Sequence, residues 1–274
     1  MRNVGRKLAF VLASSNHGTM IVNRLDYRMS GANGGIGVGY QVLEAAAFDP
    51  VEVELALQLI EARKRMHGDG VVAIDGGANI GVHTIEWATA MTGWGSVIAI
   101  EAQERIYYAL AGNIAINNCF NAIAMHAAVS SEPGIMQIPT PDYFLPANFG
   151  NLELKPHVDT EFIGQPVDYS AAKTVAIQKI SLDALALPRV DLIKLDIEGM
   201  ELEALEGARQ TIGRGHPVIL VESVKAGRDR LRGFLDEHEY RVVEAGVNLL
   251  AIHRSDSVVN ELQIPERPAQ QSAA

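Results

Sequence analysis

Residues 71–84 constrain the fold more than any other part of the chain, and they read Val-Val-Ala-Ile-Asp-Gly-Gly-Ala-Asn-Ile-Gly-Val-His-Thr. The first four residues are apolar and mostly β-branched, which predicts a buried parallel strand that ends at Asp75. The glycines after it predict a tight turn, and residues 80–91 change to helical periodicity. The first amides of that helix are unpaired donors, so the segment has the form of a nucleotide-binding unit.

Two carboxylates indicate which nucleotide this unit binds. A dinucleotide places its pyrophosphate against the helix amides, and Asp75 would repel it, whereas the ammonium and sulfonium of S-adenosylmethionine would be attracted. Glu101 ends the apolar segment 96–100, about 20 residues beyond the last glycine, where a ribose diol is usually bound. The residues predicted to bind this cofactor are Asp75, Gly76, Gly77, Asn79, Gly81 and Glu101, with His126 and Asp196 as further candidates.

Composition excludes some classes of function. The net charge of −10 argues against a nucleic-acid surface, which needs clustered Lys and Arg. The one cysteine, Cys119, cannot form an internal disulfide, so we expect a reducing, cytoplasmic location. The apolar run at 8–13 is too short for an export signal or a membrane span.

The chain divides into a main domain and three further segments. We expect an N-terminal extension at 1–48, whose glycine-rich part at 31–39 is a connector or a lid. The main domain, 49–254, opens on a helix that Asp49 and Pro50 begin, with Glu52 as the capping-box partner. Proline and aromatic residues at 131–180 predict a β-rich insertion that either borders the substrate or only packs, and 255–274 is a frayed tail.

The alternation of strands and helices continues through the main domain. Buried strands are predicted at 122–126, around 192–195 and at 218–222, with helices at 104–117, 201–211 and 229–238. The domain closes on a hairpin at 240–253, unlike a dehydrogenase half, which ends on a parallel strand. His126 ends a strand, so it either lies near the adenine or is a structural residue.

Four stretches in this order carry a resemblance to a known family: 75–81, Glu101, Ser181-Leu-Asp183, and Ile193-Lys-Leu-Asp196-Ile-Glu198-Gly-Met-Glu201. Over about residues 70 to 253, the chain resembles the FkbM family of S-adenosylmethionine-dependent methyltransferases. The resemblance implies an α/β, Rossmann-like, doubly wound class I methyltransferase sheet of seven strands with the last strand antiparallel. It also implies methylation, usually at oxygen, of natural products, sugars or related small molecules.

Methyl transfer needs an acceptor oxygen held in line with the methyl group and a group that accepts its proton. Asp196 is the first candidate for this catalytic role and Glu198 the second, although both could instead cap the helix that follows. Asp196 and Glu222 could also share a magnesium ion. His83 could reach the cofactor loop, or it packs locally.

Two other functions stay open from the sequence alone. A protein of this fold could bind S-adenosylmethionine without catalysis. An NAD(P)-dependent oxidoreductase would use the same loop and Glu101, but Asp75 and the closing hairpin disfavour it.

Overall fold

A seven-stranded sheet forms the centre of the molecule in the computed structural model, which describes residues 7–30 and 34–256. The strands lie in the order β13-β14-β12-β11-β5-β6-β7. Strands β7, β6, β5, β11 and β12 are parallel, and β14 is antiparallel to both β12 and β13. The bounds are β5 Val71–Gly76, β6 Gly95–Glu101, β7 Ala122–His126, β11 Leu192–Leu195, β12 Val218–Glu222, β13 Tyr240–Ala245 and β14 Asn248–His253. The predicted doubly wound sheet with its last strand antiparallel is confirmed.

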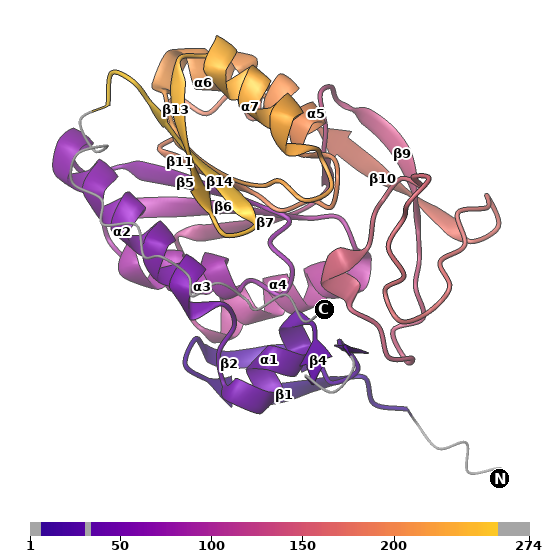
Figure 1. The fold of residues 1–274 in the computed structure, drawn as a ribbon. Coiled ribbons are helices and arrows are strands. Elements are labelled where there is room, and N and C mark those ends of the chain that lie inside the picture. The colour runs from indigo at the N-terminus through magenta and orange to yellow at the C-terminus, as the bar shows by residue number, and fades with distance from the viewer. Residues whose placement is uncertain (1–6, 31–33, 257–274) are drawn as a thin grey trace, which may run out of the picture.

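Helices cover both faces of this sheet (Figure 1). On one face lie α2 Pro50–His67, α3 Val82–Ala90 and α4 Glu104–Ile116, and on the other α5 Glu201–Glu206, α6 Arg209–Gly215 and α7 Arg228–Glu237. Successive strand residues point to opposite faces, so Leu192 joins the core under α2 and α3 while Ile193 joins the core under α5 to α7. The strands are therefore apolar along their whole length, as the sequence indicated.

Two local predictions in these helices are wrong. Asp49 precedes α2 in a left-handed conformation and makes no side-chain capping bond. Glu52 turns into the interior, where it accepts a hydrogen bond from Asn248 Nδ2 at 2.5 Å, so it is not a capping-box partner.

The single helix predicted at 201–211 is two helices, α5 and α6. The break lies at Gly207, which packs so closely that a Cβ there would be 2.3 Å from the Ser130 carbonyl oxygen. Asp183 then accepts the N–H groups of Gln210 (3.0 Å) and Thr211 (2.8 Å). It caps the start of α6 from a distant part of the chain, a role that helical periodicity does not reveal.

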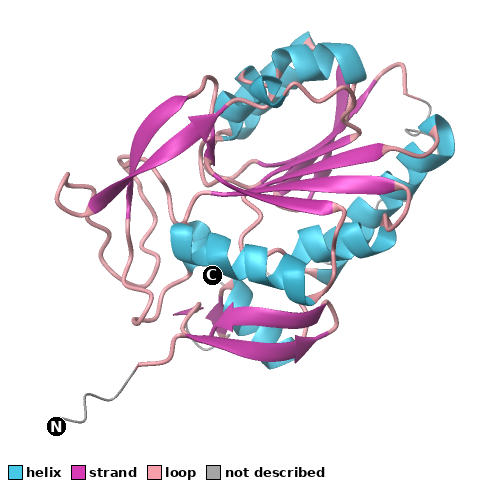
Figure 2. Ribbon diagram, turned by 180° about the vertical axis from the view of Figure 1, so that it is seen from behind, coloured by secondary structure: helices cyan, strands magenta, loops and turns pink. Residues whose placement is uncertain are grey.

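The N-terminal segment adds a further layer outside α4, visible at the bottom of Figure 2. It consists of the hairpin β1 Phe10–Ser15 and β2 Gly18–Asn23, the short pair β3 Arg28–Met29 and β4 Gly35–Ile36, and helix α1 Val38–Ala45. The buried Asn113 of α4 fixes the hairpin, because its Oδ1 accepts the Ile21 N–H at 2.5 Å. Residues 31–33 of the glycine-rich stretch and most of the predicted tail lie outside the described residues.

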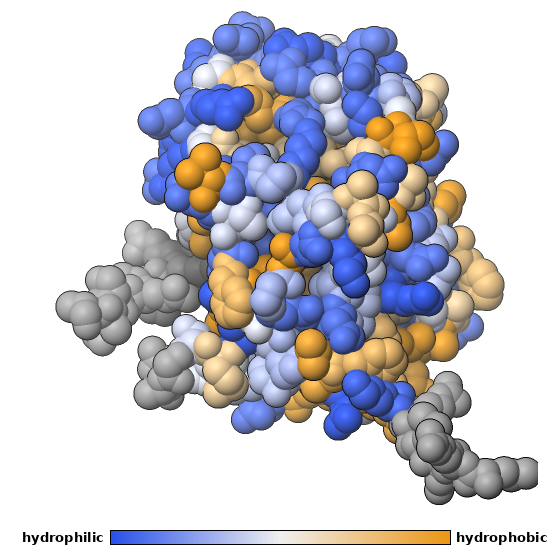
Figure 3. Space-filling model, turned by 90° about the vertical axis from the view of Figure 1, so that its right-hand side faces the viewer, coloured by the Kyte–Doolittle hydropathy of each residue, from blue (hydrophilic) through white to orange (hydrophobic). Residues whose placement is uncertain are grey.

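Residues 128–180 form a small sheet beyond the carboxyl ends of the main parallel strands (Figure 1). Its strands are β8 Ala128–Val129, β9 Gly134–Pro139 and β10 Thr174–Ile180, in the order β8-β10-β9. Between β9 and β10 the chain is mostly irregular, with a 3-10 turn, η2, at Phe149–Asn151. On the face seen in Figure 3, apolar side chains are scattered among polar ones.

Candidate active site

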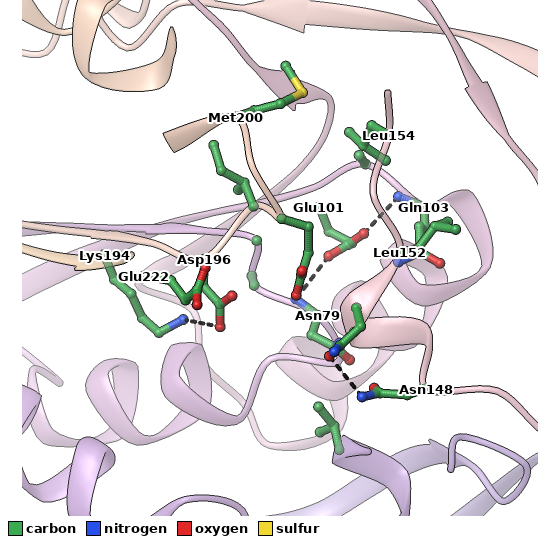
Figure 4. Close-up of a pocket in the computed structure, with 18 of the residues that line it drawn as sticks. Asn79, Glu101, Gln103, Asn148, Leu152, Leu154, Lys194, Asp196, Met200 and Glu222 are labelled. Carbon is green, nitrogen blue, oxygen red and sulfur yellow. Dashed lines mark hydrogen bonds and ion pairs between the residues drawn. The ribbon is translucent and has the colours of Figure 1, made fainter. Parts of the chain in front are cut away.

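A cavity of about 400 Å³ lies at the carboxyl ends of β5, β6, β11 and β12. One wall comes from these strand ends and the loops that follow them (Figure 4). The N-terminal segment supplies other lining residues, including Val38, Gln41 and Phe48, and the insertion supplies Asn148, Leu152, Leu154 and others. Segments far apart in the sequence thus enclose one site.

The glycine loop after β5 is held tightly against the neighbouring strand end. Gly77 has φ +77°, and a Cβ on it would lie 1.8 Å from the backbone oxygen of Asp196, so only glycine fits there. Asn79 also has a positive φ, of 50°. Gly77 and Asn79 line the cavity, whereas Gly76 and Gly81 are not among its lining residues and serve close packing behind it.

Glu101 is fixed at the tip of β6 and faces this cavity. It is 6% exposed, and its Oε2 accepts the Asn79 N–H at 3.0 Å while Oε1 accepts the Gln103 N–H at 2.7 Å. Burial raises the pKa of Glu101 to about 7. The carboxylate keeps capacity to accept a further hydrogen bond, so this side chain can receive a donor group of a ligand.

Gln103 is a lining residue that the sequence reasoning missed. Its Nε2 donates to the Phe149 carbonyl at 2.8 Å, and its Oε1 accepts the Tyr143 hydroxyl at 3.1 Å. It therefore joins the end of β6 to the insertion. A glutamine two residues beyond a strand end is expected to face solvent, so the sequence gives no signal of this contact.

The structure does not place Asp75 on the cavity wall, and this corrects the expected contact with the donor's ammonium. Asp75 is 1% exposed, and its Oδ2 accepts the Thr84 hydroxyl at 2.6 Å. Its side chain points from the sheet face toward α3, beside Lys194 of the next strand, not toward the open end of the strand. Burial raises its pKa, so its influence on a ligand is an indirect electrostatic one.

A buried polar cluster beside Asp75 is the main feature that sequence reasoning missed. Lys194 of β11 is 4% exposed, with its Nζ 3.4 Å from Asp196 Oδ2 and 3.9 Å from Glu52 Oε1. Burial alone would lower the pKa of Lys194, but the carboxylates of Asp196, Glu52 and Asp75 outweigh burial and raise it. Burial raises the pKa of Glu52 to about 7. His83 of α3 lies in the same cluster and lines the cavity.

Three acidic residues line the cavity at the ends of β11 and β12, next to Lys194. They are Asp196, Glu198 and Glu222. Figure 4 shows Asp196 and Glu222 side by side, with the Lys194 ammonium close to Asp196. Glu198 is committed to an ion pair with Lys225. Asp196 is therefore the better placed of the two predicted catalytic acids.

The loop that carries these acids is shaped by Glu201. This fully buried carboxylate accepts the Ile197 N–H at 2.9 Å and the Gly199 N–H at 3.0 Å. Burial raises the pKa of Glu201 to about 7. The sequence alternative that Asp196 or Glu198 caps the following helix is not what the structure shows, because the N-cap residue of α5 is Met200 and no side chain caps this helix.

His126 is not part of the cavity. It is exposed, with its Nε2 3.1 Å from the Ala102 carbonyl oxygen and its ring stacked on Tyr107 at 5.0 Å. The expected contact with adenine is corrected in favour of the structural alternative, because the ring turns toward α4.

The magnesium hypothesis gains no support. Within residues 7–30 and 34–256, no group of three or more His, Cys, Asp or Glu side chains is arranged to hold a metal ion.

Within the same ranges, no helix is both long and apolar enough to cross a membrane.

The reversed seventh strand and the cavity at the strand ends define the class I methyltransferase fold. Residues 75–242 match the model of the FkbM methyltransferase domain, and the chain belongs to that family.

Individual relatives are more distant. The chain is 27% identical over 158 residues to the methyltransferase sdnD of Sordaria araneosa, covering 49% of this chain and 59% of that protein. The crystal structure of an FkbM methyltransferase from Methylobacillus flagellatus aligns with TM-score 0.47 and 17% identity, over 68% of this chain and 44% of the other. Magnesium protoporphyrin IX methyltransferase from Synechocystis, solved with S-adenosylmethionine bound, aligns with TM-score 0.42 and 9% identity, over 80% and 86%. The chain thus spans less than two thirds of the first two relatives.

Proposed function

We propose that this protein transfers a methyl group from S-adenosylmethionine to a hydroxyl oxygen of a small-molecule acceptor. The observation that carries the proposal is Glu101, a buried carboxylate fixed by two backbone N–H groups beside the Gly77 turn. A carboxylate in this position suits a ribose diol. The same cavity continues to Asp196, where an acceptor can lie.

The residues present suit the donor along the whole cavity. Glu101 would hold the ribose, and apolar side chains nearby, including Leu152, Leu154 and Met200, offer a surface for the adenine. The donor's positive charge would lie toward the acidic strand ends of β11 and β12, which favours a cation over a pyrophosphate. This charge pattern supports the methyl donor over an NAD(P) cofactor.

Asp196 is the residue that we assign to the acceptor. Its carboxylate faces the cavity, and Lys194 at 3.4 Å holds it from behind. In the transfer, the acceptor oxygen forms a bond to the methyl carbon while the carbon–sulfur bond breaks and its electron pair stays on sulfur. The proton of the hydroxyl passes to the Asp196 carboxylate, which orients the oxygen before transfer.

Turnover separates this proposal from donor binding without catalysis. The protein is incubated with methyl-labelled S-adenosylmethionine and a small-molecule extract, and labelled product is measured by mass spectrometry. We expect Asp196→Asn to lose at least about 100-fold in turnover, the lower end of the range for removing a proton acceptor, while saturable donor binding persists. Asp236→Asn, at an exposed carboxylate on α7, is the matched control. Donor binding with no labelled product in any sample would favour the non-catalytic alternative.

A further inference from the structure

Two residues that line the cavity each have a buried side-chain atom with no hydrogen-bond partner. These atoms are Oε2 of Glu222 and Nε2 of His83. Both residues line the cavity, and Glu222 ends β12. His83 of α3 lies 3.3 Å from Glu52, which lies 3.9 Å from Lys194 of β11. Buried polar atoms in native proteins are nearly always paired, so two unpaired ones on residues that line a single cavity indicate a place for a ligand's polar groups.

Glu222 ends β12 with one carboxylate oxygen in use and the other free. Oε1 accepts the Val224 N–H at 3.0 Å, which fixes the side chain. Oε2 is buried and has no partner, and Glu222 lines the same cavity as Asp196. Burial, and then the neighbouring Asp196 carboxylate, raise the pKa of Glu222. A hydroxyl donating to Oε2 would satisfy the unpaired oxygen.

His83 is the second unpaired group, and it is 5% exposed. Its Nε2 lies 3.3 Å from Glu52 Oε1 but makes no hydrogen bond with it. The ring is held edge-on against Trp87 at 5.6 Å. Burial, and then Lys194 and His17, keep its pKa well below the ordinary range, so the imidazole is neutral and adds no positive charge.

The charged side chains that line the cavity as a whole disfavour anions. Five lining residues are carboxylates, namely Glu101, Glu161, Asp196, Glu198 and Glu222, against two ammonium groups, Lys194 and Lys225. Both ammonium groups are engaged: Lys194 by Asp196 and Glu52, and Lys225 by Glu198 and by Glu161 at 3.5 Å. Among the described lining residues, therefore, no ammonium is left to receive a carboxylate or phosphate.

We propose that Glu222 and His83 form the acceptor subsite, and that this subsite selects an uncharged molecule that donates hydrogen bonds and rejects anionic acceptors. The inference rests on the proposed methyl transfer and adds the chemical class of the acceptor to it. Glu222 and His83 act as specificity-determining residues, because the Glu222 carboxylate repels an anion and the neutral His83 ring supplies no positive charge to bind one.

The test uses a small-molecule extract separated by ion exchange into neutral, anionic and cationic fractions. Each fraction is incubated with the full chain and methyl-labelled S-adenosylmethionine, and donor affinity is measured separately by calorimetry. We expect label in the neutral fraction and at least tenfold less in the anionic one. Label mainly in the anionic or the cationic fraction would overturn the subsite while leaving methyl transfer intact. No label in any fraction would overturn both.

Variants then assign the selectivity to the two residues. Glu222→Gln and His83→Ala should each reduce kcat/KM for the labelled neutral compound by at least tenfold, with a loss of donor affinity several-fold smaller than that reduction. Glu132→Gln, at a largely exposed carboxylate paired with Lys179, serves as the matched control and should change neither quantity. If both site variants match this control, Glu222 and His83 do not contact the acceptor. Circular dichroism checks that each variant is folded.

Discussion

The two sides of the cavity are built in different ways. One side consists of strand ends, where parallel backbone register places Gly77, Glu101 and Asp196 next to one another. The other side consists of the N-terminal segment and the insertion, which hydrogen bonds from individual side chains hold in place. Asp26 is the central one: it is 2% exposed and accepts the Gly39 N–H at 2.8 Å and the Phe149 N–H at 2.9 Å. The strand-end side is thus fixed by topology, and the covering side by a few polar contacts.

The largest expected effect tests the strand-end side. Gly77→Ala should destabilise the protein by about 3 kcal/mol or more, because it combines a left-handed backbone with a clash against the Asp196 carbonyl. Gly93→Ala is the matched control, since Gly93 has φ +85° but no atom within 4 Å of its added Cβ. Urea denaturation measures both. Equal losses in the two variants would show that the contact with Asp196 is not tight.

The covering side predicts a smaller loss at Asp26. Asp26→Ala leaves two buried N–H groups unpaired, which should cost about 2 kcal/mol and increase proteolysis within the N-terminal segment and the insertion. The cost is partly offset because burial raises the pKa of Asp26 to about 6, so its charged form is itself unfavourable. Limited proteolysis and urea denaturation check this. Unchanged cleavage would mean that Asp26 does not join the two segments.

Buried carboxylates give the donor-free protein a pH dependence of intermediate size. The pKa of Glu101 is raised from its ordinary 4.5 to about 7, so between these pH values the folded state holds a proton that the unfolded state has released. The stability that this group contributes is full below pH 4.5 and lost as pH rises toward 7. Glu101→Gln should therefore have a higher free energy of unfolding than the parent at pH 8, by at least about 1 kcal/mol. At pH 4.5 the variant should show no such gain. A variant whose stability follows pH as steeply as the parent's would contradict this assignment.

The smallest effect is expected at the rim of the covering side. Arg28 and Glu161 form an ion pair at 2.5 Å between the N-terminal segment and the insertion, with both side chains partly exposed. Arg28→Ala should cost less than about 1 kcal/mol, because water and salt screen such pairs. Thermal unfolding at low and high salt measures the loss. A cost as large as that of Asp26→Ala would mean that the exposed pair, too, anchors the covering side.

The same contrast explains what the sequence could reveal. Strand periodicity and acids at strand ends are local patterns, so the strands and the positions of Glu101 and Asp196 at strand ends could be predicted from the sequence. The seven-stranded sheet with its last strand antiparallel was implied by the family resemblance. The face to which Asp75 points depends on its place within the pleat, and the contact of Gln103 with Phe149 joins distant segments. Neither the direction of the Asp75 side chain nor the contact of Gln103 can be predicted from a local sequence pattern.

Lys194 is the one missed residue that had a sequence signal. It interrupts an apolar strand at 192–195, and a lysine buried in a sheet requires charged partners. Its partner Glu52 comes from a helix 142 positions earlier in the chain, where it reads as a capping residue. The need for a partner could be predicted, but not which residue meets it.

Calorimetry with S-adenosylmethionine tests most directly whether the strand-end side of the cavity is a donor site built around Glu101. We predict saturable binding to the parent protein. Glu101→Ala should have a Kd about 10- to 100-fold higher, as expected for the loss of charged hydrogen bonds worth about 1.5 to 3 kcal/mol. His126→Ala should have an unchanged Kd. Absence of binding heat, or equal affinity in the parent and Glu101→Ala, would contradict the account.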